Sequence, residues 1–366
     1  METSLITPRE RNWGVDLLRI VSMLLIVLMH VLNIGGVAAS VKTGSAKYII
    51  VELFYALCYC CVNCYALISG YVGINGRYKY TNIVMIWFQV IFYTLSITLI
   101  YSLVSHTAIP QENMLKAFFP VMCKEYWYIS SYVGLFFLMP ILNIAINKAS
   151  FKQLLGIILP LFVIFTLLPF FPIYKDISGL GGGYSVIWLM YLYLIGGFLS
   201  KFKDEIERIS NFSLVAIYII TTLMLFVGDM LVDREITFFK ELSFLSYTSP
   251  ICVIQSVCMM ILFSRMKLKK LVPIVKFFAP LTLGVFLIHV HTYIWYPVLK
   301  NRFVSYAKTS TIVFILYVIL TVFGIYIACS LIDFVRNSIF KALKLKERIY
   351  KLELKTIGDV WGTRDN

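Results

Sequence analysis

Hydrophobic runs long enough to cross a membrane alternate with short polar segments along nearly the whole chain. Apolar runs of about 20 residues are typical of transmembrane helices. We therefore predict an all-α, polytopic membrane bundle of about ten helices. Their expected limits are residues 13–37, 48–75, 82–104, 126–147, 153–172, 184–200, 211–232, 247–264, 279–299 and 309–335.

The first of these runs carries three ionisable residues, Asp16, Arg19 and His30. Each Asp or Arg at mid-helix costs roughly 2.5 to 3.5 kcal/mol on an insertion scale, so a function is the default explanation. Arg19 and His30 are eleven residues apart, which is close to three turns and places both on one helix face about 16 Å apart. Asp16 lies one turn before Arg19 and is the expected counter-ion.

Composition excludes an ordinary soluble domain, because 60% of the residues are hydrophobic. The net charge is +14, with Lys and Arg concentrated in short loops and in the C-terminal segment. This distribution fits the positive-inside rule better than a nucleic-acid surface, so we expect membrane lipids and not nucleic acid as partners. It also favours cytoplasmic positions for both termini.

We predict an integral-membrane domain over residues 1–335 and a basic cytoplasmic tail over 336–366. The tail mixes apolar residues such as Phe340 with basic ones such as Lys341, a pattern typical of a helix lying on the membrane surface. Asp333, near the inner end of the last run, is expected to be an interfacial charge.

Two residues of the first run are the main catalytic candidates. His30 can act as a general base near neutral pH, or it can be a packing histidine bonded to a neighbouring carbonyl. Arg19 can hold a phosphate or a carboxylate, or it can merely bridge helices through Asp16 or extend to the inner surface. These roles are compatible, and the sequence leaves them open.

Other candidates are weaker on their own. Trp127 and Tyr128 are first of all membrane-interface aromatics, but their faces can also stack on a sugar. Ser69, beside a glycine at the end of the second run, fits close helix packing as well as substrate binding. His289 and His291 point to different sides of a helix, so at most one of them faces His30.

No metal site is expected from the eight cysteines. Four of them crowd one apolar run, but their spacing scatters them around a helix, which disfavours tetrahedral zinc. Buried free cysteines usually behave as small hydrophobes. The four are Cys58, Cys60, Cys61 and Cys64.

Four motifs occur in a characteristic order. Asp16 precedes an Arg, ten residues and a His in the first run; CYALISGYVG, with Ser69, ends the second. YWYISSYVGLFFLMPILN opens the fourth run, and LGVFLIHV, ending at His289, lies in the ninth. In this combination the chain resembles the integral-membrane acyltransferase-3 family over nearly its whole length.

The resemblance implies an acyl-CoA-dependent O-acyltransferase that acts on a bacterial surface polysaccharide or a lipid-linked sugar. It implies acetyl-CoA as the usual co-substrate, no bound cofactor, and a multi-pass location in the bacterial plasma membrane. The catalytic residues would be His30, Arg19 and Asp16. The substrate-binding residues would be Trp127, Tyr128, Glu125, Ser69 and His289, with Glu125 standing where many relatives have His.

Two other functions remain open at this stage. A transporter or flippase for lipid-linked sugars would use Arg19 and His30 as a translocation path, but such proteins usually contain an internal repeat, which is not visible here. A polysaccharide polymerase would be expected to carry a large outer loop with catalytic Arg or acidic residues. The longest outer loop here, about residues 105–125, is poor in them.

Overall fold

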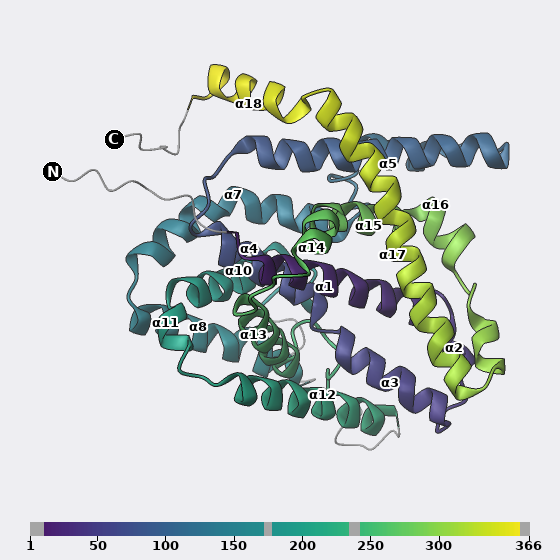
Figure 1. The fold of residues 1–366 in the computed structure, drawn as a ribbon, viewed down its shortest axis with the longest axis horizontal. Coiled ribbons are helices and arrows are strands. Elements are labelled where there is room, and N and C mark those ends of the chain that lie inside the picture. Colours follow the sequence, from purple (N-terminus) through teal and green to yellow (C-terminus); the bar gives the residue numbers. More distant parts are fainter. Residues whose placement is uncertain (1–10, 172–177, 234–241, 359–366) are drawn as a thin grey trace.

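The computed structural model describes residues 11–171, 178–233 and 242–358, and every regular element within these ranges is helical (Figure 1). The first half contains α1 Trp13–Leu32, α2 Val37–Ser40, α3 Ala46–Cys58, α4 Cys61–Gly73, α5 Tyr80–Ser105, α6 Gln111–Phe118, α7 Trp127–Lys148, α8 Phe151–Phe162 and α9 Leu168–Phe170. The second half contains α10 Val186–Lys201, α11 Lys203–Ile206, α12 Asn211–Asp233, α13 Pro250–Ser264, α14 Val272–Phe278, α15 Thr282–His289, α16 Thr292–Ile294, α17 Thr311–Ala342 and α18 Leu345–Thr356.

The predicted membrane bundle is confirmed. In the described part of the chain, eight helical segments are long and apolar enough to cross a membrane. Two shorter apolar helices, α10 and α13, occupy the remaining two predicted positions. Most of these helices run along one common direction in Figure 1, whereas α17 crosses them steeply.

Three predicted spans differ from the observed helices. The second span consists of α3 and α4, which are separated at Tyr59 and Cys60. The ninth span was expected over 279–299, but its helix starts at Val272 and ends at His289. It ends there because His291 is in a non-helical conformation and its ring nitrogen accepts a hydrogen bond from the Tyr293 amide. The last helix, α17, continues past residue 335 to Ala342.

The centre of the bundle depends on very close packing between α4 and α10. A Cβ atom on Gly70 would lie 2.0 Å from the carbonyl oxygen of Tyr193, and one on Gly196 would lie 2.1 Å from that of Leu67. Only glycine permits these approaches, as is common between membrane helices. The glycine of the predicted Ser-Gly pair thus serves packing, and its neighbour Ser69 is held in a fixed position on α4.

A buried ion pair joins α5, α15 and α17. Asp333 is fully buried and accepts hydrogen bonds from Gln89 and Tyr93 at 3.0 and 2.7 Å. Arg336 donates to both of its carboxylate oxygens, at 2.9 and 2.8 Å. The expectation of an interfacial charge at Asp333 was therefore wrong. Since a Cβ atom on Gly284 would lie 2.1 Å from the Asp333 carboxyl carbon, α15 also packs directly on this pair.

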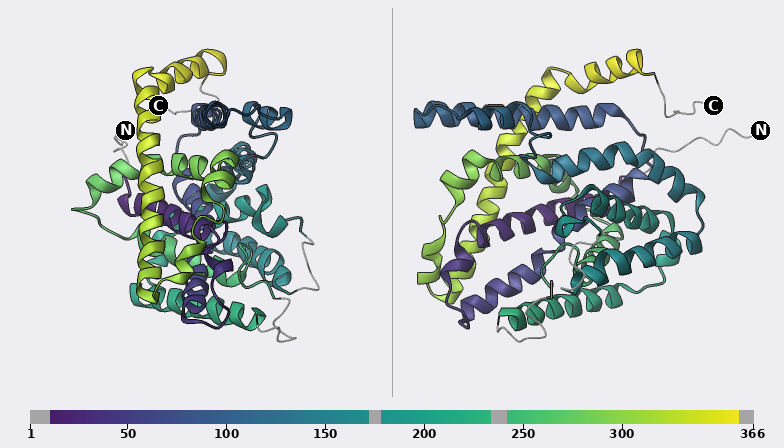
Figure 2. Two further views of the ribbon diagram at one scale, coloured as in Figure 1. Left: turned by 90° about the vertical axis from the view of Figure 1, so that its right-hand side faces the viewer. Right: turned by 180° about the vertical axis from the view of Figure 1, so that it is seen from behind.

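The C-terminal helix α18 contacts the beginning of α5 (Figure 2). The Glu353 carboxylate accepts hydrogen bonds from the backbone amides of Tyr80 and Thr81 at 2.9 and 2.8 Å. These amides belong to the first turn of α5, where N–H groups have no partner within the helix. The Lys79 ammonium also lies 4.0 Å from the ring centre of Tyr350. A membrane-surface position for this tail stays a prediction.

Candidate active site

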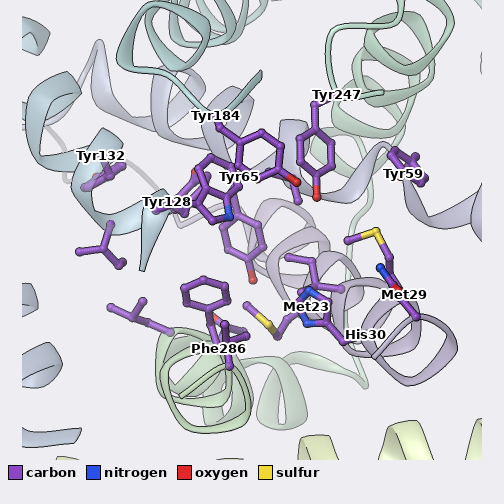
Figure 3. Close-up of a pocket in the computed structure, with 18 of the residues that line it drawn as sticks. Met23, Met29, His30, Tyr59, Tyr65, Tyr128, Tyr132, Tyr184, Tyr247 and Phe286 are labelled. Carbon is purple, nitrogen blue, oxygen red and sulfur yellow. The ribbon is translucent and has the colours of Figure 1, made fainter. Parts of the chain in front are cut away.

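A cavity of about 720 Å³ is lined by residues of α1, α3, α4, α7, α12 and α15 (Figure 3). Five residues singled out from the sequence line it, although they come from three separate helices. They are Arg19, His30, Ser69, Trp127 and Tyr128. The fold therefore brings together most of the candidate residues around one space.

His30 is in direct contact with His289. The Nδ1 atom of His30 lies 2.9 Å from Nε2 of His289, and Nδ1 of His289 lies 2.6 Å from the carbonyl oxygen of Val285. A carbonyl can only accept, so Nδ1 of His289 must carry a proton. With both rings neutral, His289 then accepts through Nε2, and the Nδ1–H of His30 donates to it. Nε2 of His30 is left with a free lone pair, as a general base requires.

The surroundings of His30 are apolar. The Trp295 ring meets the His30 ring edge-on, with 4.7 Å between ring centres. Met23, Met29 and Phe286 line the same part of the cavity, and Figure 3 shows these three side chains near His30. Such an apolar lining strengthens the electrostatic interactions made against it.

Arg19 lies at the other end of α1 from His30. It forms an ion pair with Asp16, which is 2% exposed and also binds Arg11. Asp16 therefore is the counter-ion predicted for Arg19, but it lies behind the cavity and does not line it. Because the single carboxylate of Asp16 pairs with two guanidinium groups, Arg11, Asp16 and Arg19 together carry a net positive charge.

A second cavity, of about 240 Å³, continues from the Arg19 end. It shares Arg19, Ser69 and Tyr132 with the larger cavity and extends to Arg77 and Lys79 in the α4–α5 connection. The shared residues make the two cavities neighbours. Their linings together extend from a basic loop, past Arg19, to His30.

Glu125 lies outside the larger cavity. Its carboxylate accepts a hydrogen bond from the Thr292 hydroxyl at 2.7 Å, and both residues line a small pocket with His291. Of the two late histidines, only His289 contacts His30 among the described residues, which agrees with the prediction that at most one of them would do so.

Three acidic residues on the cavity wall were not identified from the sequence. Glu52 lies in α3, and Asp229 and Asp233 lie in the last turns of α12. One carboxylate oxygen from each lies within 4.8 Å of the others, a spacing that could hold a cation. The sequence alone could have indicated these three residues, because each is an acidic residue within or at the end of an apolar run.

Comparison with known proteins places the chain in a family. Residues 12–330 match the family described as "Acyltransferase domain", the acyltransferase-3 family. No curated protein and no solved structure gives a significant match to the chain. Because the match covers most of the sequence, the chain belongs to the acyltransferase-3 family of membrane acyltransferases.

Proposed function

We propose that the protein transfers an acyl group, most readily acetyl, from acyl-CoA to a hydroxyl of a bacterial surface polysaccharide or a lipid-linked sugar. The observation that carries this proposal is one cavity lined by both Arg19 and His30, with His30 in contact with His289. In an acyltransferase, this cavity offers an anion-binding group at one end and a base at the other.

The Arg19 end suits the donor. Acyl-CoA carries phosphates, and guanidinium groups bind phosphate through paired charge-assisted hydrogen bonds. Arg77 and Lys79 line the smaller cavity, where they would meet the phosphates, while Arg19 lies at the junction of the two cavities. The acyl thioester would then extend along α1, over about 16 Å, to reach His30.

The histidine pair supplies the proton transfers. Nε2 of His30 takes the proton from the acceptor hydroxyl as its oxygen attacks the thioester carbonyl. The carbon–sulfur bond breaks, and the departing thiolate takes the proton from His30. His289 stabilises the transient imidazolium by accepting from its Nδ1–H, and holding both substrates in one cavity supplies rate through proximity.

The direction of transfer follows from the predicted orientation. With both termini in the cytoplasm, Arg19 lies towards the inner side, where acyl-CoA is found, and His30 lies towards the outer side. The acceptor would enter past Trp127 and Tyr128. We propose the bacterial plasma membrane as the location of the protein.

The proposal is tested by measuring CoA release from acetyl-CoA by the purified protein in liposomes, with and without a glycan extract of the native cells. We expect release that the extract stimulates, and acetyl ester in the recovered glycan. Folded protein that releases no CoA with acetyl-, succinyl- or propionyl-CoA, yet moves lipid-linked sugar across the bilayer, would establish the transporter instead.

Arg19→Ala should raise the apparent KM for acetyl-CoA by roughly ten- to a hundredfold, the loss expected for one charge-assisted contact. Arg19→Lys should recover only part of the affinity, because lysine lacks the guanidinium fork. Initial rates at varied acetyl-CoA check this result. Arg302→Ala is the matched control, since Arg302 does not line either cavity. Equal donor KM values in the two alanine variants would contradict the assignment.

His289→Ala should lower kcat by roughly ten- to a hundredfold, because the His30 imidazolium loses its hydrogen-bond acceptor. The KM for acetyl-CoA should stay near the wild-type value. His289→Gln, whose amide oxygen can accept from His30, should recover part of kcat, and steady-state kinetics distinguishes the variants. A purely structural role for His289 would instead lower the amount of folded protein and leave kcat per folded molecule unchanged.

A further inference from the structure

A third cavity lies beside the start of α1, apart from the two described above. Its volume is about 700 Å³, close to that of the cavity around His30, yet it shares no lining residue with either of the other two. Its walls come from the start of α1, from α11, and from the end of α13 with the loop that follows it. It is therefore a separate space that the proposed acyl transfer does not use.

Backbone packing fixes the walls of this third cavity. The Asn12 side-chain amide donates to the carbonyl oxygen of Ser264 at 2.7 Å. A Cβ atom on Gly14 would lie 1.9 Å from the carbonyl oxygen of Phe263, so the backbones of α1 and α13 approach as closely as only glycine allows. The cavity is thus preformed by the fold, as small-molecule sites usually are.

One cation of the lining is held in place by neutral groups. The Arg265 guanidinium donates to the carbonyl oxygens of Ile206 and Ile209 at 2.7 and 2.8 Å. It also donates to the side-chain oxygen of Asn211 at 2.8 Å. Carbonyl and amide oxygens carry no net charge, so they orient the guanidinium without cancelling its positive charge.

The lining as a whole carries an excess of positive charge. Arg11 shares the carboxylate of Asp16 with Arg19, and the Lys203 ammonium lies 4.0 Å from Asp204. The other two basic residues of the lining form no ion pair with any described residue. The charged lining residues are the bases Arg11, Lys203, Arg265 and Lys267 and the acid Glu207.

The rest of the lining is apolar and more deeply buried. Leu199, Met260 and Ile261 are buried there, whereas three of the four bases are exposed. The aromatic rings of Trp13 and Tyr71 also line the cavity. Tryptophan and tyrosine at the ends of membrane helices favour the depth of the lipid head groups. A ligand that fills this space therefore needs both an anionic part and an apolar part.

A phospholipid head group with net negative charge combines these properties. Phosphate oxygens accept strong charge-assisted hydrogen bonds from guanidinium and ammonium groups, and basic pockets between membrane helices bind such head groups. A zwitterionic head group would bring another cation into a cavity that already has an excess of them. A soluble phosphate compound would leave the apolar wall uncovered.

We propose that this third cavity binds the head group of an anionic phospholipid, at the membrane surface where α1 begins. The phosphate pairs with Arg265 and Lys267, and Lys203 adds a further positive charge. The glycerol end of the acyl chains lies against Met260 and Ile261. This site is independent of the proposed acyl transfer, because its lining is separate from both cavities assigned to that reaction.

The first test compares lipids on the intact protein. Delipidated protein in neutral detergent is mixed with equal amounts of phosphatidylglycerol and phosphatidylcholine, and native mass spectrometry counts the lipids that stay bound. We expect one phosphatidylglycerol per protein to be retained preferentially. Equal retention of the two lipids would overturn the inference. Displacement of the lipid by soluble glycerol 3-phosphate or by CoA would also overturn it, because the ligand would then be a free phosphate compound.

The second test separates this site from general attraction to a basic protein. The double variant Lys203→Gln with Lys267→Gln should retain roughly tenfold less phosphatidylglycerol, or lower still, because two charged contacts are lost. The matched control is Lys269→Gln with Lys270→Gln, which removes the same charge from exposed residues outside the cavity. It should bind like the wild type. Equal retention by the two double variants, with unchanged thermal midpoints, would overturn the site.

Discussion

Replacing His30 with alanine is expected to lower the rate of acyl transfer by about 10²- to 10⁴-fold, the usual contribution of a general base. The free Nε2 of His30 is the only imidazole nitrogen of the histidine pair that lacks a hydrogen-bond partner among the described residues, so His289 cannot replace it. CoA release at saturating donor and glycan measures the loss.

His106→Ala is the matched control, because His106 is exposed in a loop and does not line the cavity. It should retain wild-type activity. The thermal midpoint of the His30 variant in detergent should stay within a few degrees of the wild-type value. A folded His30→Ala protein with more than about a tenth of the wild-type rate would be incompatible with general-base catalysis at this residue.

Replacing Asp333 with alanine is expected to have the largest effect on stability. It would leave the Arg336 guanidinium, which is 5% exposed, without a counter-ion. Removing one partner of a buried ion pair costs about 3 to 5 kcal/mol. Gln89 and Tyr93 would also lose their acceptor. Thermal unfolding in detergent should therefore show a clear decrease in the midpoint.

A double variant separates this charge effect from simple loss of packing. Asp333→Ala combined with Arg336→Leu removes both charges and should recover a large part of the lost stability. Glu112→Ala breaks an exposed ion pair with Lys116 and should change the midpoint little. If Asp333→Ala unfolds at the same temperature as Glu112→Ala, the ion pair does not hold α5, α15 and α17 together.

The helices were predictable because long apolar runs have few alternatives in a membrane. The positions at which the helices end were harder to predict. The segment after His289 remains rich in apolar residues, such as Ile294 and Trp295, so hydropathy could not indicate that the helix stops there. Asp333 was expected at an interface because the last predicted span stops at residue 335. The observed helix continues for seven more residues, and one of them, Arg336, pairs with Asp333 inside the bundle.

The candidate site was predictable only where one helix determines the geometry. Arg19 and His30 share a face of α1, and both line the cavity. The contact between His30 and His289 spans 259 residues of sequence, and periodicity carries no information on such a distance. For the same reason Glu52 and Asp229 could be recognised singly, as acids in apolar runs, but not as neighbours.

The contact between Glu353 and the first turn of α5 has a consequence for biosynthesis. Tyr80 leaves the ribosome 273 residues before Glu353, which at typical elongation rates amounts to about 14 to 55 seconds. Throughout this interval α5 is inserted with the amides of Tyr80 and Thr81 uncapped. The contacts around Lys79, which lines the smaller cavity, are thus completed only when translation is almost finished.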